Sequence, residues 1–338
     1  MDLNVLWFIL LGVLLTGYAI LDGFDLGVGI VHLAVKKDKE RRILMNSIGP
    51  LWDGNEVWLV TFGGALFAAF PHAYATAFSG FYTPFMILLF ALIFRAVSIE
   101  FRSKHDAPAW RAFWDVSFCV ASALATFLFG VAVGNAMRGM PIGPDMEFQG
   151  CFVDLLHPYA LLVGAFAVAT FAMHGSIYLH LKTEGELQQR IREWMWRTFG
   201  IFLVFYLFTT IYTLVDVPLA TANFRLHPQA WLVVVLNVLA IANIPRAIHL
   251  RRPGYAFASS CATIAALTFL FGVALFPDLI HSSLNPDWSL TVYNAASSKK
   301  TLAIMATIAA LGMPFVLAYT SVVYWVFRGK VQLGKFSY

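Results

Sequence analysis

The sequence predicts an all-α integral membrane protein, with nine transmembrane helices in a single domain that spans residues 1–338. The first observation behind this fold class is composition, because 59% of the 338 residues are hydrophobic and only 12% are charged. Soluble domains have about 45–50% apolar and about 25% charged residues. The second observation is a series of apolar runs, each near the roughly 20 residues that cross a hydrocarbon layer. A water-soluble fold, a disordered chain and a nucleic-acid-binding domain are therefore excluded.

Nine apolar runs follow one another along the chain, and each is expected to form one transmembrane helix. They cover residues 3–31, 52–70, 77–100, 113–136, 157–180, 197–217, 229–248, 255–276 and 300–327. The runs are long and continuous, whereas barrel strands would show about ten residues of alternating polarity, so helices are predicted. The segments between them hold most of the charged residues and many prolines, as expected where a chain leaves the membrane. Nine crossings place the two termini on opposite sides.

The distribution of Lys and Arg predicts the orientation, because positively charged loops stay in the cytoplasm. Eighteen of these residues fall on one side of the predicted helices and four on the other. The larger set consists of Lys36, Lys37, Lys39, Arg41, Arg42, Arg102, Lys104, Arg111, Lys182, Arg190, Arg192, Arg197, Arg246, Arg251, Arg252, Arg328, Lys330 and Lys335. The smaller set consists of Arg138, Arg225, Lys299 and Lys300. The N-terminus is therefore predicted outside and the C-terminus in the cytoplasm.

Six carboxylates gather at the inner ends of the first four predicted helices, and this is the strongest functional signal in the sequence. They are Asp22, Asp25, Asp53, Glu56, Glu100 and Asp115. An ionisable group in a membrane segment usually faces the bundle interior or a water-filled path, because its exposure to lipid is costly. Carboxylates that are partly desolvated and close together can hold protons and hand them on. The sequence therefore predicts a proton path that starts at the cytoplasmic side.

Structural roles are alternatives for several of these acids. Residues 53–56 (DGNE) fit a capping box at a helix start. Arg95 can pair with Glu100 and anchor its helix, and Asp115 fits a solvated acid in a first helical turn, where the helix dipole favours it. Asp22 and Asp25 lie too far inside an apolar run to cap a helix, so a structural explanation fits these two least.

Small residues predict close helix packing around Asp25. Gly23 and Gly27 are four residues apart and flank it, and Gly64 and Ala68 repeat this spacing in the second run. Such a spacing lets two membrane helices approach closely. The glycines do not indicate a nucleotide-binding loop, because no strand precedes them.

The histidines do not predict a haem or metal site within this chain. A membrane haem usually takes axial ligands that project into the bundle core from facing helices. Of the nine histidines, only His174 lies well inside a predicted helix, whereas the others, His227 among them, fall at helix ends or in loops. We therefore expect that this chain alone binds no cofactor or metal and holds no catalytic residue.

Several sequence blocks in the first third of the chain resemble subunit II of the cytochrome bd quinol oxidases. The blocks are Leu21–Gly29 (LDGFDLGVG), Asn46–Trp58 (NSIGPLWDGNEVW), Gly63–Pro71 (GGALFAAFP), Phe78–Tyr82 (FSGFY) and Phe94–Lys104. The resemblance weakens after them but continues to Ser297–Thr301, at the start of the last predicted helix. So many blocks in the same order make the resemblance specific.

The resemblance implies a respiratory terminal oxidase complex in a bacterial or archaeal plasma membrane, which oxidises quinol and reduces oxygen to water. In this family subunit I carries two b-type haems and haem d, single-helix accessory subunits can join, and some members hold a structural quinone in subunit II. The family's proton path begins in subunit II, and the matching positions here are Asp25, Asp53, Glu100 and Ser103. Glu100 stands where some relatives carry Asp. Further candidates for the path are Asp22, Glu56, Arg95 and Arg102.

The predicted function is therefore to support subunit I and to supply it with protons from the cytoplasm, which contributes to the proton motive force. One alternative is a purely structural anchor for subunit I. Another is a stand-alone secondary transporter, in which buried acids couple ions to solute movement. Transporters of that kind show inverted repeats and broken helices near the midplane, whereas the acids here lie at one end of their helices.

Overall fold

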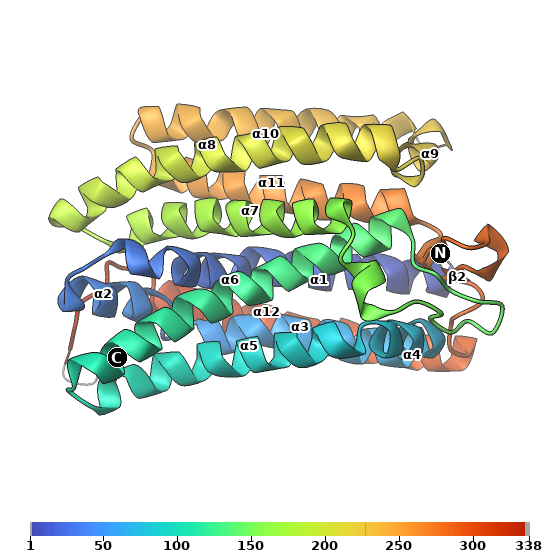
Figure 1. Cartoon of the computed structure of the whole chain (residues 1–338), viewed down its shortest axis with the longest axis horizontal. Helices are drawn as coiled ribbons and strands as arrows, with labels where there is room; N and C mark the ends of the chain where they lie inside the picture. The colour runs from blue at the N-terminus through green and yellow to red at the C-terminus, as the bar shows by residue number, and fades with distance from the viewer. Residues whose placement is uncertain (1, 227, 335–338) are drawn as a thin grey trace.

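The structure, a computed structural model, describes residues 2–226 and 228–334. It is an elongated bundle in which the long helices run along one axis and their connections gather at the two ends (Figure 1). The all-α class is confirmed, since the described residues add to the helices only one short antiparallel pair of strands. Lys335 and His227, both used in the sequence argument, lie outside the described residues.

The described residues form twelve α-helices and five short 3₁₀ turns. The first part contains α1 (Leu3–Val31), η1 (His32–Ala34), α2 (Asp38–Ile48), α3 (Trp52–Ala69), α4 (Pro71–Gly80), α5 (Tyr82–Phe101), η2 (Arg102–Lys104), α6 (Pro108–Arg138) and η3 (Phe152–Leu155). The second part contains α7 (Pro158–Lys182), α8 (Gly185–Asp216), α9 (Leu219–Leu226), η4 (Pro228–Ala230), α10 (Trp231–His249), α11 (Pro253–Leu275), β1 (Asp278–Ile280), η5 (Pro286–Trp288), β2 (Leu290–Thr291) and α12 (Lys299–Val326).

Eight of the described helices are long and apolar enough to cross a membrane, namely α1, α5, α6, α7, α8, α10, α11 and α12. The protein is therefore a multi-pass membrane protein. The predicted run 52–70 corresponds to α3, which has 18 residues but is not among the eight. Its first turns carry Asp53, Asn55 and Glu56, and these polar side chains lower its mean hydropathy.

Two predicted runs differ in extent from the helices that form. The run 77–100 is divided, because α4 ends at Gly80 and α5 begins only at Tyr82. α4 itself begins at Pro71, and a proline at this position favours the start of a new helix over the continuation of α3. The run 197–217 is too short, because α8 begins at Gly185 and its polar first turns extend the helix well beyond the apolar part.

The contact between α1 and α7 depends on glycine. A Cβ atom on Gly27 would lie 1.9 Å from the carbonyl oxygen of Phe171, and one on Gly175 would lie 2.4 Å from the carbonyl carbon of Gly27. The prediction that small residues beside Asp25 permit close packing is therefore confirmed. The same prediction for Gly64 is wrong within this chain, since a Cβ there would have no described atom within 4 Å.

The two ends of the bundle differ in charge. One end, on the left in Figure 1, holds α2 and the connections α5–α6, α7–α8 and α10–α11, whereas α4, α9 and the strands lie at the opposite end. Most described members of the larger cation set lie in or beside the connections of the left end. The four cations of the smaller set lie toward the opposite end. The two sets predicted from the sequence therefore separate between the two ends.

Candidate functional site

Two carboxylates of α1 lie in the interior of the bundle. Asp22 and Asp25 are completely buried, in a stretch of α1 where every residue from Asp22 to Gly29 is buried. Three residues along a helix turn the side chain by about 300°, so the two acids point to adjacent faces. Each therefore meets different neighbours, and the two have different hydrogen-bond partners.

Asp22 forms an ion pair with Arg95 of α5. Arg95 Nη1 donates to Asp22 Oδ2 at 2.9 Å, and Nη2 donates to Asp22 Oδ1. The guanidinium is buried as completely as the carboxylate, and this two-point geometry is the strongest form of such a pair. The predicted pair between Arg95 and Glu100 is wrong, because a separation of five residues places them on different faces of α5. Glu56 of α3 lies within electrostatic range of Arg95 and Asp22.

Asp25 instead makes one hydrogen bond to a neutral amide. Asn55 Nδ2 of α3 donates to Asp25 Oδ2 at 2.7 Å, and the Oδ1 atom of Asp25 is buried without a hydrogen-bond partner among the described residues. The Oδ1 atom of Asn55 accepts from the hydroxyl of Tyr324, on α12, at 2.8 Å. A hydrogen-bonded chain therefore links α1, α3 and α12 through Asp25, Asn55 and Tyr324. Sequence reasoning missed the last two; Asn55 lay inside a quoted motif, whereas Tyr324 carried no signal.

A groove with mainly apolar walls and several polar groups leads to this chain from the surface. It has a volume of about 580 Å³ and lies between α3 and α12, where Asp53, Asn55, Thr61, Thr320 and Tyr324 contribute polar groups to its walls. Asp53 is exposed at the start of α3. The capping box predicted for residues 53–56 is wrong, because α3 begins one residue earlier and its N-cap, Leu51, makes no side-chain hydrogen bond.

Another buried acid, Asp115 of α6, lies in a cluster of cations near the end of the bundle. It accepts hydrogen bonds from Arg102 Nε at 2.6 Å and Arg41 Nη1 at 2.7 Å, and its Oδ1 lies 2.6 Å from His32 Nε2. Arg102 also donates to Asp38 at 2.8 Å. The prediction of a solvated first-turn acid is wrong, because α6 begins at Pro108 and Asp115 is completely buried two turns later.

Glu100 and Ser103 belong to neither group. Glu100 is half-buried near the end of α5, and Ser103 is exposed in η2. Neither side chain makes a hydrogen bond or ion pair to another described residue. The structure thus places Asp53 in the wall of the groove, links Asp25 to that wall through Asn55, and pairs Asp22 with Arg95. It also ties Arg102 to Asp115, but no direct contact connects Glu100 or Ser103 to any of these described residues.

The described residues offer few groups for a haem or a metal. They include no cluster of three or more His, Cys, Asp or Glu side chains that could hold a metal ion. His174 is completely buried, with Nδ1 2.8 Å from Ser260 Oγ and Nε2 3.1 Å from the carbonyl oxygen of Ile20. Both ring nitrogens therefore have partners within the protein, and His174 does not fit the role of a haem ligand.

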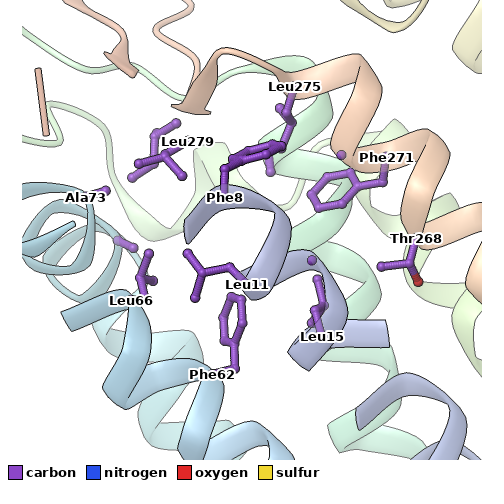
Figure 2. A pocket seen from close by; sticks show the side chains of 15 residues that line it. Phe8, Leu11, Leu15, Phe62, Leu66, Ala73, Thr268, Phe271, Leu275 and Leu279 are labelled. Atoms are coloured by element: carbon purple, nitrogen blue, oxygen red, sulfur yellow. The ribbon is translucent and has the colours of Figure 1, made fainter. Parts of the chain in front are cut away.

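A separate apolar cavity lies toward the other end of α1. Figure 2 shows Phe8 and Leu11 of α1 and Phe271 of α11 around it, together with Leu66 of α3. Its volume is about 180 Å³, and Thr268 provides the one side-chain hydroxyl in its lining. These walls fit an apolar tail but offer almost no hydrogen-bonding group to a quinone head.

Comparisons with known proteins identify relatives over nearly the whole chain. The family model for cytochrome bd terminal oxidase subunit II matches residues 3–327. The cytochrome bd-I ubiquinol oxidase subunit 2 of Escherichia coli K12 is 36% identical, over 97% of this chain and 95% of that protein. The cytochrome bd ubiquinol oxidase subunit 2 of Bacillus subtilis 168 is 37% identical, over 98% of this chain and 97% of that protein.

A solved structure has the same fold. A chain of the bd oxidase from Geobacillus thermodenitrificans matches with a TM-score of 0.79, over 97% of this chain and 99% of that one. The two sequences are only 18% identical in this alignment, so this match supports the fold and carries no residue role.

Proposed function

Since the chain belongs to the family of cytochrome bd terminal oxidase subunit II, we propose that it supplies protons from the cytoplasm to oxygen reduction in a partner, subunit I. The family makes it a subunit of an oxidoreductase complex, a respiratory terminal oxidase. In this proposal subunit I binds the two b-type haems and haem d, and this chain has no catalytic residue. The ring nitrogens of His174, already engaged within the protein, support this division.

The environment of Asp25 is the observation that carries the proposal. A buried carboxylate with one oxygen unpartnered and a single amide on the other is poorly stabilised as an anion, because burial removes the water that would solvate it. Such a group can take up and release a proton within the membrane. Through Asn55 and Tyr324 it reaches a groove that is lined by an exposed acid, Asp53.

The proposed route begins at Asp53, which collects protons from water at the groove. Water in the groove carries them past Tyr324 and Asn55 to Asp25, because an amide side chain orients a relay but does not itself pass protons on. Glu100 and Ser103 are the proposed continuation on α5 and η2, and water must bridge them to Asp25 since no direct contact joins them. Glu56, Arg102 and the Asp22–Arg95 pair set the local charge.

The proposed membrane arrangement has nine crossings, with α3 as the ninth. α3 lies parallel to the long helices in Figure 1. The residues of its polar first turns line the groove, so their polarity is compatible with a membrane-spanning helix. The end that holds most of the Lys and Arg residues is assigned to the cytoplasm, which leaves the N-terminus outside. Proton uptake from that side during oxygen reduction contributes to the proton motive force.

The surface of α12 supports a partner subunit at this site. Only 6% of the residues in its most apolar stretch are buried, against 61% for α7. Leu311, Phe315 and Trp325 are exposed large side chains along it. We place subunit I over this face, where it would close the groove between α3 and α12 toward lipid. Accessory single-helix subunits, a structural quinone and a plasma-membrane location belong to the same proposal.

The test is oxidase turnover of the assembled complex with Asp25→Asn and Asp53→Asn. We expect quinol-driven oxygen consumption to fall by an order of magnitude or more for Asp25→Asn, as is typical when a positioned proton-transfer group is lost. The visible haem spectrum of the complex should be unchanged. Asp145→Asn, which changes an exposed acid in the α6–α7 connection, is the matched control. Normal turnover in both the Asp25→Asn and the Asp53→Asn complex would favour a purely structural anchor.

A further inference from the structure

A polar pocket opens at the cation-rich end of the bundle, away from the acids of α1. Its volume is about 370 Å³. The α7–α8 connection and the α10–α11 connection form its walls, which include His180, Gln188, Arg192, Arg251 and Arg252. No Asp or Glu belongs to the described lining.

The three arginines of this pocket lack anionic partners within the described chain. Arg192, Arg251 and Arg252 each have no described carboxylate within 4 Å. Among the described residues, the Arg192 guanidinium makes one polar contact, a long one of 3.5 Å to the carbonyl oxygen of Ile248. Arg252 lies over the ring of Tyr255. By contrast, Arg102, Arg111 and Arg190 at the same end each pair with an acid. The pocket therefore concentrates uncompensated positive charge.

The backbone holds one of these arginines in an uncommon conformation. Arg251 has a φ of +55°, in the left-handed region that non-glycine residues seldom adopt. The neighbouring Arg252 N–H donates to the carbonyl oxygen of Ala247 at 2.9 Å, so the turn between α10 and α11 is closed by its own hydrogen bonds. Arg251 and Arg252 thus extend from a fixed turn rather than from a loose loop.

We propose that this pocket binds a phosphate group. Guanidinium groups recognise phosphate through paired N–H donors, and basic pockets between membrane helices at the cytoplasmic side bind lipid headgroups. Exposed Trp196 and Tyr255 lie within a turn of the pocket, and such aromatic residues mark the membrane interface. Beyond them, exposed Ile201 of α8 and Leu239 of α10 offer apolar surface to acyl chains. The headgroup of an anionic phospholipid and free phosphate share the chemistry that the pocket requires.

The experiment compares lipid and free phosphate on the purified complex. Native mass spectrometry measures retained phosphatidylglycerol and phosphatidylcholine after reconstitution in nanodiscs, and a thermal-shift titration uses inorganic phosphate alone. The variants are Arg192→Gln, Arg251→Asn and Arg252→Gln, singly and together, with Arg197→Gln as the control. Arg197 lies farther along α8, is highly exposed and does not line the pocket. Asn tolerates the left-handed conformation at position 251, so that single variant keeps the test valid if the triple variant fails to assemble.

We expect the wild-type complex to retain phosphatidylglycerol in preference to phosphatidylcholine, and affinity to fall about fivefold for each arginine removed. In a second outcome, phosphate raises the thermal midpoint of the wild type but not of the triple variant, and both retain lipid equally. This outcome would also support the pocket and would identify free phosphate as its ligand. Equal lipid retention and equal phosphate response in the wild type, the triple variant and the control would overturn the proposal.

Discussion

Two buried aspartates near the same end of the bundle, Asp25 and Asp115, are stabilised in opposite ways. Asp115 accepts hydrogen bonds from two arginines and lies beside a histidine, whereas Asp25 has one amide donor and an unpartnered oxygen. From the sequence they differ in depth, since Asp25 lies well inside an apolar run and Asp115 lies near the start of one. The comparison teaches that burial alone does not distinguish the two acids, whereas the cations that each one contacts do.

The largest effect on stability is expected for Asp115→Ala. Removal of this carboxylate leaves Arg102 and Arg41 at the end of the bundle without their main anion, and breaking a buried ion pair from one side costs about 3–5 kcal/mol. The measurement is the thermal midpoint and yield of the purified complex. Asp106→Asn, at an exposed acid that pairs with Arg111, is the control and should change little. If Asp115→Ala and Asp106→Asn change the thermal midpoint and yield equally, the contacts of Asp115 do not stabilise the protein.

Arg95→Gln should have the next largest effect, because it leaves Asp22 buried without a cation. We expect a loss of about 3 kcal/mol, read from the same thermal midpoint. The double variant Asp22→Asn, Arg95→Gln removes both charges and should recover much of the loss. If the double variant is as unstable as Arg95→Gln, the loss of stability does not come from leaving the Asp22 charge unpaired.

Gly27→Ala tests the contact of α1 with α7, two residues after Asp25 along α1. The added methyl group would meet the Phe171 carbonyl at 1.9 Å, and overpacking of this kind costs about 1–3 kcal/mol. Gly12→Ala is the matched control, because it lies on the same helix and its Cβ position has no described atom of another part of the chain within 4 Å. Equal thermal midpoints for the two variants would mean that α1 and α7 separate without penalty.

Asp25→Asn should have the smallest effect on stability, less than about 1 kcal/mol, although it is expected to reduce turnover most. The amide oxygen can still accept from Asn55, and the change removes a buried charge that has no cation partner. This variant separates the roles of Asp25 and Asp115, because a substitution that lowers turnover without lowering stability identifies a side chain that takes part in function. A destabilisation as large as that of Asp115→Ala would remove the distinction between the two acids.

Much of the fold could be predicted from the sequence, because lipid imposes a simple rule on it. A helix that faces hydrocarbon must be apolar over its whole length, so the bounds of α1 agree with the predicted run 3–31. Where a helix contains polar turns, as α3 does at Asp53 and Glu56, hydropathy alone no longer identifies it as a transmembrane helix. The extension of α8 to Gly185 was missed for the same reason, since that part of the helix is polar.

The partners of the acids could not be predicted, because they depend on how helices rotate against each other. Arg95 was assigned to Glu100 along its own helix, whereas α5 turns it toward Asp22. Asp115 was expected near water, and only the fold shows Arg41 and His32 around it. Tyr324 is one of many aromatic residues in apolar helices, and its hydrogen bond to Asn55 depends on the position of α12 beside α3.

The contact of Asn55 with both Asp25 and Tyr324 joins the first helix of the chain to the last. During synthesis α1 and α3 enter the bilayer long before the ribosome has made α12. If protons follow this route, the path is absent until α12 has been made. A nascent or prematurely terminated chain then leaves the membrane sealed, and the cell is protected from leakage while the subunit is being built.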